Sequence, residues 1–463
     1  MTTVIDRCDV VVTMDDAGTE ISGGSLVIDG GAIAWVGAGA PPETLATGRP
    51  EHVDGCGLIA VPGLVNSHHH LYQTMTRVRA QAHGLFEWLR ELYPVWASVD
   101  DEWVHVGALV GLAELALSGC ATSTDHHYVF PRDRAAAGVG LLQAEIDAAR
   151  RLGLRFHPCR GSMDLGESSG GLPPDSIAQD ADTVLAQTEE AVRRFHDPSA
   201  GSMLRIAIAP CSPFSVTDRL MRESASLARR LDVRLHTHIA ETLDEDAYCR
   251  ARYGKRPLEL LDDLGWIGDD VWLAHCVHLD EQGVRRVAAS RTGVAWCPSS
   301  NLRLGSGIAP VRALLDAGAR VGLGVDGSAS NDSGHLLAEA RTGLLAARAR
   351  GAAGMTAREA LRAATRGGAA CLGRNDIGSL EAGKRADVAL FDVSGLEHAG
   401  AASDPVAALV FCTPGRVRHL WVEGRPVVRE RRLVGVDEDE VAAAGRRVAQ
   451  RIAGSRQAGS VSR

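Results

Sequence analysis

The chain has 463 residues, and its composition excludes several classes of protein. A net charge of −9 and a pI near 6.0, with no basic stripe carrying interleaved aromatic residues, argue against nucleic-acid binding. Hydrophobic residues make up 45% and charged residues 23%, as in soluble globular enzymes, and no stretch reaches the 18 apolar residues that a membrane span needs. The ten cysteines are dispersed without a Cys-x-x-Cys pair, which favours a reduced, cytoplasmic protein over a disulfide framework.

Three regions of different character follow one another along the chain. Residues 1–60 alternate short strands (9–13, 25–29, 32–36) with Gly-rich turns. Residues 61–374 alternate apolar strands with amphipathic helices, which predicts a parallel (β/α)8 barrel of the TIM type as the catalytic domain. From residue 375 the pattern returns to strands (386–392, 417–424). We expect both chain ends, 1–60 and 375–463, to form one small β-sandwich domain, with a helix at 437–452 and a disordered tail at 454–463.

Local signals place one helix and one loop near the predicted site. Ser98 is the expected cap of a helix that has Asp101 at its third position and ends at Gly119. The Gly- and Pro-rich segment 164–174 predicts a mobile loop over the site.

The apolar run at residues 58–61 leads into three consecutive histidines at positions 68–70. On a strand, residues two apart point to the same face, so His68 and His70 would point together and His69 away. Two imidazoles aimed at one point form half of a metal site.

Three further polar clusters also follow apolar strands. His238 with Glu241, then His275, then Asp326 each stand where a predicted strand ends. The carboxyl ends of barrel strands meet on one face, where such active sites are assembled. Taken alone, each residue has an ordinary structural explanation, as a turn, a core histidine or a helix start; their order along the chain favours a common site. His236 and His278 remain closer to ordinary structural histidines.

The motifs Pro-Gly-x4-His-x-His, His-x-x-Glu, Ala-His-Cys and Gly-x-Asp-Gly resemble those of the amidohydrolase superfamily, in its nucleobase and aminohydrolase branch, over the whole chain. The resemblance implies a distorted barrel and one divalent metal, held by His68, His70, His238 and Asp326. Segment 156–160 has no Lys that could bridge two metals as a carbamate, so we expect a mononuclear site. Nitrogen and oxygen ligands fit Zn²⁺, with Fe²⁺ and Mn²⁺ as alternatives.

The resemblance also implies hydrolytic deamination. The metal would make hydroxide available near neutral pH. Asp326 and His275 would take up the proton and steer the nucleophile onto an amidine-like ring carbon. Glu241 would carry a proton to the adjacent ring nitrogen, and the amine would leave as ammonia.

Substrate choice rests on a few positions. Trp96, Cys211 and Leu172 stand where adenosine-type members carry residues that grip the ribose, so a free base is expected. Arg160 matches an Arg that the adenosine-type members also carry. Gln73 matches the Gln with which guanine-type deaminases read a ring edge. The predicted substrate-binding residues are Gln73, Trp96, Arg160 and Cys211.

Segments 68–73, 125–128 and 326–332 resemble the 8-oxoguanine deaminases, which implies conversion of 8-oxoguanine to urate and ammonia. The alternatives are a guanine- or isocytosine-type deaminase, an s-triazine amino- or chlorohydrolase and, more remotely, a barrel that has lost catalysis and serves as a scaffold. The expected partner is a small molecule, with neither nucleic acid nor membrane. A homo-oligomer is an expectation at the level of the family.

Overall fold

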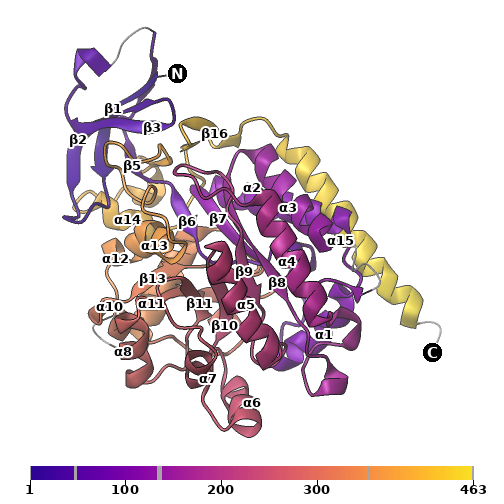
Figure 1. Cartoon of the computed structure of the whole chain (residues 1–463). Coiled ribbons are helices and arrows are strands. Elements are labelled where there is room, and N and C mark those ends of the chain that lie inside the picture. The colour runs from indigo at the N-terminus through magenta and orange to yellow at the C-terminus, as the bar shows by residue number, and fades with distance from the viewer. Residues whose placement is uncertain (1, 46–48, 133–137, 352–353, 461–463) are drawn as a thin grey trace.

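The computed structural model describes residues 2–45, 49–132, 138–351 and 354–460, and its centre is an eight-stranded parallel barrel (Figure 1). The strands follow one another in chain order around it, and Ser67 closes the ring because its N–H donates to Leu323 O at 2.9 Å. The predicted TIM-type barrel is confirmed. Its strands are β6 (Leu64–Asn66), β7 (Cys120–His127), β8 (Arg155–Ser162), β9 (Ala207–Pro210), β10 (Leu235–Ile239), β11 (Val271–His275), β12 (Gly293–Trp296) and β13 (Arg320–Leu323).

Helices surround the barrel strands on the outside (Figure 1). They are α1 (Leu85–Trp96), α2 (Asp101–Leu117), α3 (Gly138–Leu152), α4 (Ala181–Phe195), α5 (Asp218–Leu231), α6 (Leu243–Tyr253), α7 (Pro257–Asp263), α8 (Glu281–Ala289), α9 (Pro298–Arg303), α10 (Val311–Asp316), α11 (Leu336–Arg350), α12 (Ala357–Arg362), α13 (Gly368–Cys371) and α14 (Pro405–Phe411). A short 3-10 helix, η2 (Leu71–Thr76), follows the triple histidine.

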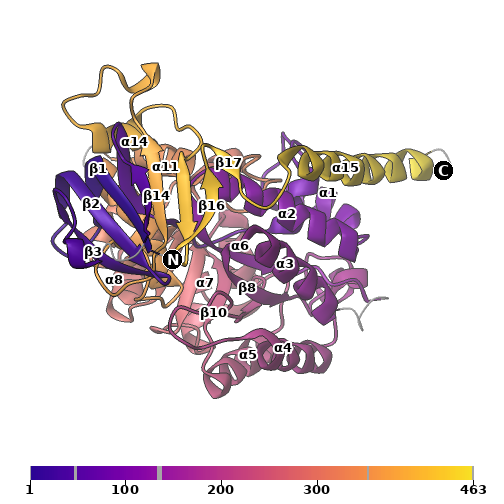
Figure 2. The same cartoon turned by 90° about the horizontal axis from the view of Figure 1, so that it is seen from above.

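Both chain ends form a second, mixed sheet beside the barrel (Figure 2). Strand β5 pairs antiparallel with β14, so residues more than 300 positions apart become neighbours, as Val61 and Ala389 do. The predicted second β unit, built from both ends, is confirmed. Its strands are β1 (Thr2–Val12), β2 (Glu20–Asp29), β3 (Ala32–Ala38), β4 (Glu51–Asp54), β5 (Leu58–Pro62), β14 (Val388–Asp392), β15 (His419–Val422), β16 (Arg425–Arg429) and β17 (Arg432–Leu433).

The chain passes between the two sheets at Gly63. A side chain there would overlap the Cβ of Ala121, so only glycine fits. The apolar run 58–61 therefore belongs to the terminal sheet, and a separate strand, β6, leads to the histidines. His68 and His70 lie beyond the end of β6 and not on a strand, which corrects the expected local geometry.

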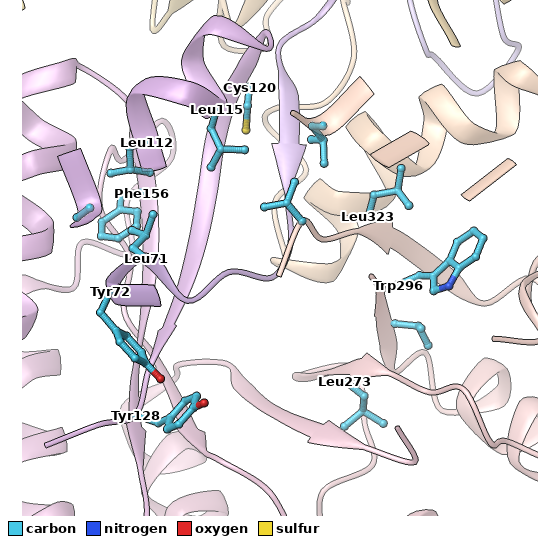
Figure 3. Packing of buried hydrophobic residues seen from close by; sticks show 14 of the residues in the cluster. Leu71, Tyr72, Leu112, Leu115, Cys120, Tyr128, Phe156, Leu273, Trp296 and Leu323 are labelled. Carbon is cyan, nitrogen blue, oxygen red and sulfur yellow. The ribbon is translucent and has the colours of Figure 1, made fainter. Parts of the chain in front are cut away.

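Apolar side chains from η2, α2 and the barrel strands fill the space behind the site (Figure 3). Leu71, Leu112 and Phe156 are buried there. The cap of α2 is Asp100 and not Ser98: the Asp100 carboxylate accepts from Trp103 N, while Ser98 Oγ donates to Val95 O at the end of α1.

The last helix, α15 (Glu438–Ser460), packs along α2 (Figure 1). Arg451 forms an ion pair with Asp100 at 2.8 Å. The helix continues to Ser460, beyond position 454 where the sequence predicted a disordered tail, and residues 461–463 lie outside the described part of the chain. Among the described residues, no helix is long and apolar enough to cross a membrane.

The loop at 164–174 is tied down by hydrogen bonds. Leu165 N donates to Ser215 O and Leu172 N to Phe214 O, and the Asp164 carboxylate accepts from Thr217. In this structure the segment packs against residues 214–217, and its mobility stays a prediction.

Candidate metal centre and active site

The chemistry-bearing residues predicted from the sequence meet at the carboxyl end of the barrel. Two histidines follow β6, His238 lies in β10, His275 ends β11, and the two carboxylates come just after β10 and β13. All are buried, the most exposed being His238 at 9%. The set is His68, His70, His238, Glu241, His275 and Asp326.

The backbone is strained at this end of the barrel. Non-glycine residues with positive φ include Ala240 (50°), His275 (72°), Cys276 (52°) and Asp326 (60°). This left-handed conformation costs free energy for residues with a Cβ, and such residues cluster at functional sites. It turns the His275 and Asp326 side chains away from the path of a regular strand.

Hydrogen bonds fix the tautomers of two histidines. His70 Nδ1 lies 2.7 Å from the carbonyl oxygen of His126, and His238 Nδ1 lies 2.7 Å from that of Cys211. Because a carbonyl can only accept, both Nδ1 atoms carry hydrogen, and both Nε2 atoms carry lone pairs. The two Nε2 atoms lie 3.0 Å apart.

The tautomer of His68 is fixed through a neighbour. His236 Nδ1 donates to the carbonyl oxygen of Trp272 at 2.9 Å, so His236 Nε2 accepts a hydrogen bond from His68 Nδ1 at 2.8 Å. His68 Nε2 therefore carries a lone pair, and this atom is buried and has no hydrogen-bond partner. It lies 3.3 Å from Asp326 Oδ1, as does His70 Nε2.

Three imidazole lone pairs and one carboxylate oxygen thus converge on one point. These groups repel one another unless a cation lies between them. Ligand atoms about 2.0–2.1 Å from one ion, at angles near 90–110°, lie about 3 Å apart, which matches the distances here. Burial lowers the pKa of His70 and of His238 to about 4, which keeps both imidazoles neutral as ligands must be. The donor set fits a divalent metal ion.

Two groups that can handle protons lie beside this cluster. Asn301 Nδ2 donates to His275 Nδ1 at 3.0 Å, so His275 Nε2 carries hydrogen; it points at Glu241 Oε2 (3.5 Å) and Asp326 Oδ2 (4.0 Å). Ser306 Oγ donates to Glu241 Oε1 at 3.4 Å. Burial, and next the charge of Asp326, raises the pKa of Glu241 well above its usual range.

A pocket opens next to the cluster, and two of the four predicted substrate-binding residues, Gln73 and Cys211, line it. Its wall also contains His70, His238 and Asp326 of the candidate metal site, together with Glu241 and His275. The other lining residues are Leu85, Trp88, Leu89, Tyr93, Tyr128, Ser212, Phe214, Leu304 and Ser330.

The structure places the other two predicted substrate contacts elsewhere. Trp96 lies behind the pocket wall, where its Nε1 donates to Thr76 Oγ1 at 3.2 Å. Arg160 is buried away from the pocket: its guanidinium lies 3.7 Å from the ring centre of Phe130 and donates to Gln179 at 2.8 Å. Neither residue lines the pocket.

Sequence reasoning missed several lining residues, among them Trp88 and Tyr93. Both lie on α1, whose apolar spacing is that of an ordinary core-facing helix. Only the folded structure shows that the Tyr93 hydroxyl has no hydrogen-bond partner.

A second group of buried titratable side chains consists of Asp125, His127 and Glu145. His127 Nδ1 lies 2.8 Å from Glu145 Oε1, and His127 Nε2 lies 3.0 Å from Val129 O. Asp125 accepts from Leu71 N at 2.6 Å. These contacts tie β7 to α3 and to η2, directly after the triple histidine.

Comparison with known proteins agrees with this geometry. The model of the amidohydrolase family matches residues 59–427. The chain is 46% identical to 8-oxoguanine deaminase of Pseudomonas aeruginosa, over 91% of this chain and 92% of that protein. It is 38% identical to hydroxydechloroatrazine ethylaminohydrolase of Pseudomonas sp. (strain ADP), over 97% and 96%. The crystal structure of atrazine chlorohydrolase from Arthrobacter aurescens TC1, complexed with zinc, superposes with a TM-score of 0.91 at 34% identity, covering 96% of this chain and all of that one. The fold, the buried histidine and carboxylate cluster and these similarities together show that the chain belongs to the amidohydrolase family of hydrolases.

Proposed function

We propose that the chain is a metal-dependent deaminase of a free purine-type base, which converts 8-oxoguanine and water to urate and ammonia. The observation that carries the proposal is the convergence of three imidazole lone pairs and Asp326 beside a buried carboxyl. The identity of 46% to an 8-oxoguanine deaminase over nearly the whole of both chains supports the choice of substrate. The histidine and carboxylate ligands suit Zn²⁺, with Fe²⁺ or Mn²⁺ as alternatives.

The residues around the cluster have distinct tasks in this reaction. The cation, when bound, lowers the pKa of water from about 15.7 toward neutrality. Asp326 Oδ2 accepts the proton of the attacking water, while the N–H of His275 orients the Asp326 carboxylate. The Glu241 carboxyl, whose pKa burial raises well above its usual range, donates to the ring nitrogen next to the attacked carbon. As the C–N bond breaks, the proton held by Asp326 passes to the amine, which leaves as ammonia, and the hydroxyl on the attacked carbon gives its proton to Glu241 as the carbonyl forms.

The tautomer of His275 changes its expected role. Sequence reasoning assigned it, with Asp326, to proton uptake. Its Nε2 already carries hydrogen, because Asn301 donates to Nδ1 and because two carboxyls face Nε2. We therefore assign His275 the role of a hydrogen-bond donor in the resting site.

The pocket suits a flat, uncharged ring. Its apolar side chains come from α1 and from the loops after β9 and α9, and no Lys or Arg is among the described lining residues. Gln73 offers an amide to a ring edge. The residues with this apolar character are Leu85, Trp88, Leu89, Phe214 and Leu304.

A second candidate is hydrolysis of an s-triazine. The TM-score of 0.91 to an atrazine chlorohydrolase and the identity of 38% to an ethylaminohydrolase favour it. Both reactions would place a planar nitrogen heterocycle over the same cluster.

The test measures the release of ammonia by the zinc-loaded protein from 8-oxoguanine, 8-oxoguanosine, guanine, isocytosine and adenosine, and the release of alkylamine or chloride from s-triazines. The oxo group and the N–H that guanine lacks should make kcat/KM for 8-oxoguanine about tenfold higher or more. Equal turnover of 8-oxoguanosine would contradict the free-base assignment. A preference for a triazine would select the second candidate, and a protein without activity on any compound would agree with a scaffold.

A further inference from the structure

Most polar groups that line the pocket already have a partner inside the protein. Ser212 Oγ lies 2.8 Å from Ser215 Oγ, and Ser330 Oγ accepts from Ser300 at 2.9 Å. Trp88 Nε1 donates to Ala329 O at 3.2 Å.

Tyr128 is paired as well: its side chain is hydrogen-bonded to that of Tyr72, and the two side chains lie close together (Figure 3).

Apart from the imidazole nitrogens of the candidate metal site, two buried polar atoms of the described lining residues have no hydrogen-bond partner: Gln73 Oε1 and the hydroxyl oxygen of Tyr93. Both side chains are 1% exposed. A buried polar group without a hydrogen bond costs free energy, so such atoms in a pocket indicate a ligand that completes them.

The Tyr93 ring is held in place by its neighbours. Trp96 packs edge-on against it with ring centroids 5.9 Å apart, and Trp96 is itself packed against Trp88 at 5.2 Å. Trp96, expected from sequence to touch the substrate, thus supports the residue that faces the pocket.

We propose that Tyr93 is a specificity-determining residue, whose hydroxyl donates to the carbonyl oxygen of a neutral lactam in the substrate ring while Gln73 Oε1 accepts from the adjacent ring N–H. An amide oxygen and a phenol hydroxyl complement the acceptor and donor of such a lactam edge. The substrate class that fits is therefore an uncharged oxo-heterocycle. Phosphorylated bases are excluded, since no Lys or Arg is among the described lining residues. This inference deepens the proposed function and rests on it for the identity of the reacting ring.

The test measures binding of two ligands that cannot lose an amine: hypoxanthine, which has the lactam, and purine, which lacks it. Dissociation constants are measured by calorimetry for the zinc-loaded wild type and for Tyr93→Phe. We expect the wild type to prefer hypoxanthine, and the variant to bind hypoxanthine about ten- to a hundredfold more weakly with purine unchanged. Tyr253→Phe, which makes the same change outside the pocket, serves as the control.

Three results would overturn the proposal: equal affinities of wild type and variant for hypoxanthine, failure of the wild type to distinguish the two ligands, or failure to bind either. Because the hydroxyl has no partner in the protein, Tyr93→Phe should keep its Tm and metal content; a lowered Tm would indicate a structural role and would also count against it. The readout does not require catalysis. A protein that shows this binding pattern yet releases no ammonia would refute the proposed function alone.

Discussion

At the scale of single residues, the site is defined by which nitrogen atoms carry hydrogen. His70 and His238 each give one hydrogen to a backbone carbonyl, and His68 gives its own to His236. These hydrogen bonds of the Nδ1 atoms leave all three Nε2 atoms free to bind a cation, and they fix the ring orientations. His236, which sequence reasoning placed nearer to a structural histidine, is the acceptor that sets the tautomer of His68.

Glu241→Gln should separate proton transfer from metal binding. The amide keeps the shape of the side chain but cannot carry a proton, so we expect unchanged metal content and a kcat lower by roughly 10²–10⁴-fold. Steady-state kinetics and metal analysis check this, with Glu281→Gln, whose side chain is 92% exposed, as the control. Near-normal turnover would remove Glu241 from the mechanism.

Some of these residues could be found from the sequence because strand ends in a barrel meet. That rule brought together His238, His275 and Asp326 from three strands far apart in the chain. It could not find Tyr93, since a tyrosine on an apolar helix face carries no local sign of an unpaired hydroxyl. Trp96 and Arg160 were misplaced because motif matching gives a position in the chain and not the direction of a side chain.

At the scale of elements, close contact between η2 and the loop after β13 limits the position of the Gln73 amide. A side chain at Gly327, directly after Asp326, would overlap the amide of Gln73 on η2. The loop after β13 therefore leaves room for the Gln73 amide only while residue 327 has no side chain.

Gly327→Ala should displace the Gln73 amide. We expect kcat/KM on the preferred base to fall about ten- to a hundredfold, the effect of losing one or more hydrogen bonds. The control is Gly140→Ala in α3, where an added Cβ meets nothing within 4 Å. Kinetics of both variants, with metal analysis, check this; unchanged kcat/KM in Gly327→Ala would show that Gln73 does not read the ring.

The division of residues 58–66 into two strands is also an element-scale effect. The apolar pattern continues through both strands, so hydrophobicity alone predicts a single strand. What separates them is steric: Gly63 passes too close to Ala121 for any side chain, and β5 pairs with a strand over 300 residues later. Long-range pairing of this kind leaves no periodic signal in the sequence.

At the scale of the whole molecule, a buried ion pair joins the barrel to the terminal sheet. Arg155, at the start of β8, contacts Asp387 at 3.0 Å and Glu423 at 2.7 Å, and its side chain is fully buried. Asp387 is 3% exposed. The arrangement of barrel and second sheet was predictable from the change of pattern along the chain, whereas this contact between them was not.

Arg155→Ala should destabilise the fold, because it leaves the carboxylate of Asp387 buried without its cation. The expected loss in the free energy of unfolding is about 3–5 kcal/mol. Arg150→Ala, which breaks an exposed pair with Asp147, should cost no more than about 1 kcal/mol. Denaturant unfolding of both variants makes the comparison, and equal losses would show that the buried pair does not hold the two units together.

The central claim is that one divalent ion, bound by three neutral imidazoles and Asp326, supports ammonia release. The most direct test measures the metal content per chain together with the activity. We predict about one ion per chain in the wild type and in His52→Ala, whose side chain is 60% exposed. His238→Ala should lose both the ion and the activity. Two tightly bound ions per chain, or ammonia release by metal-free protein, would contradict the account.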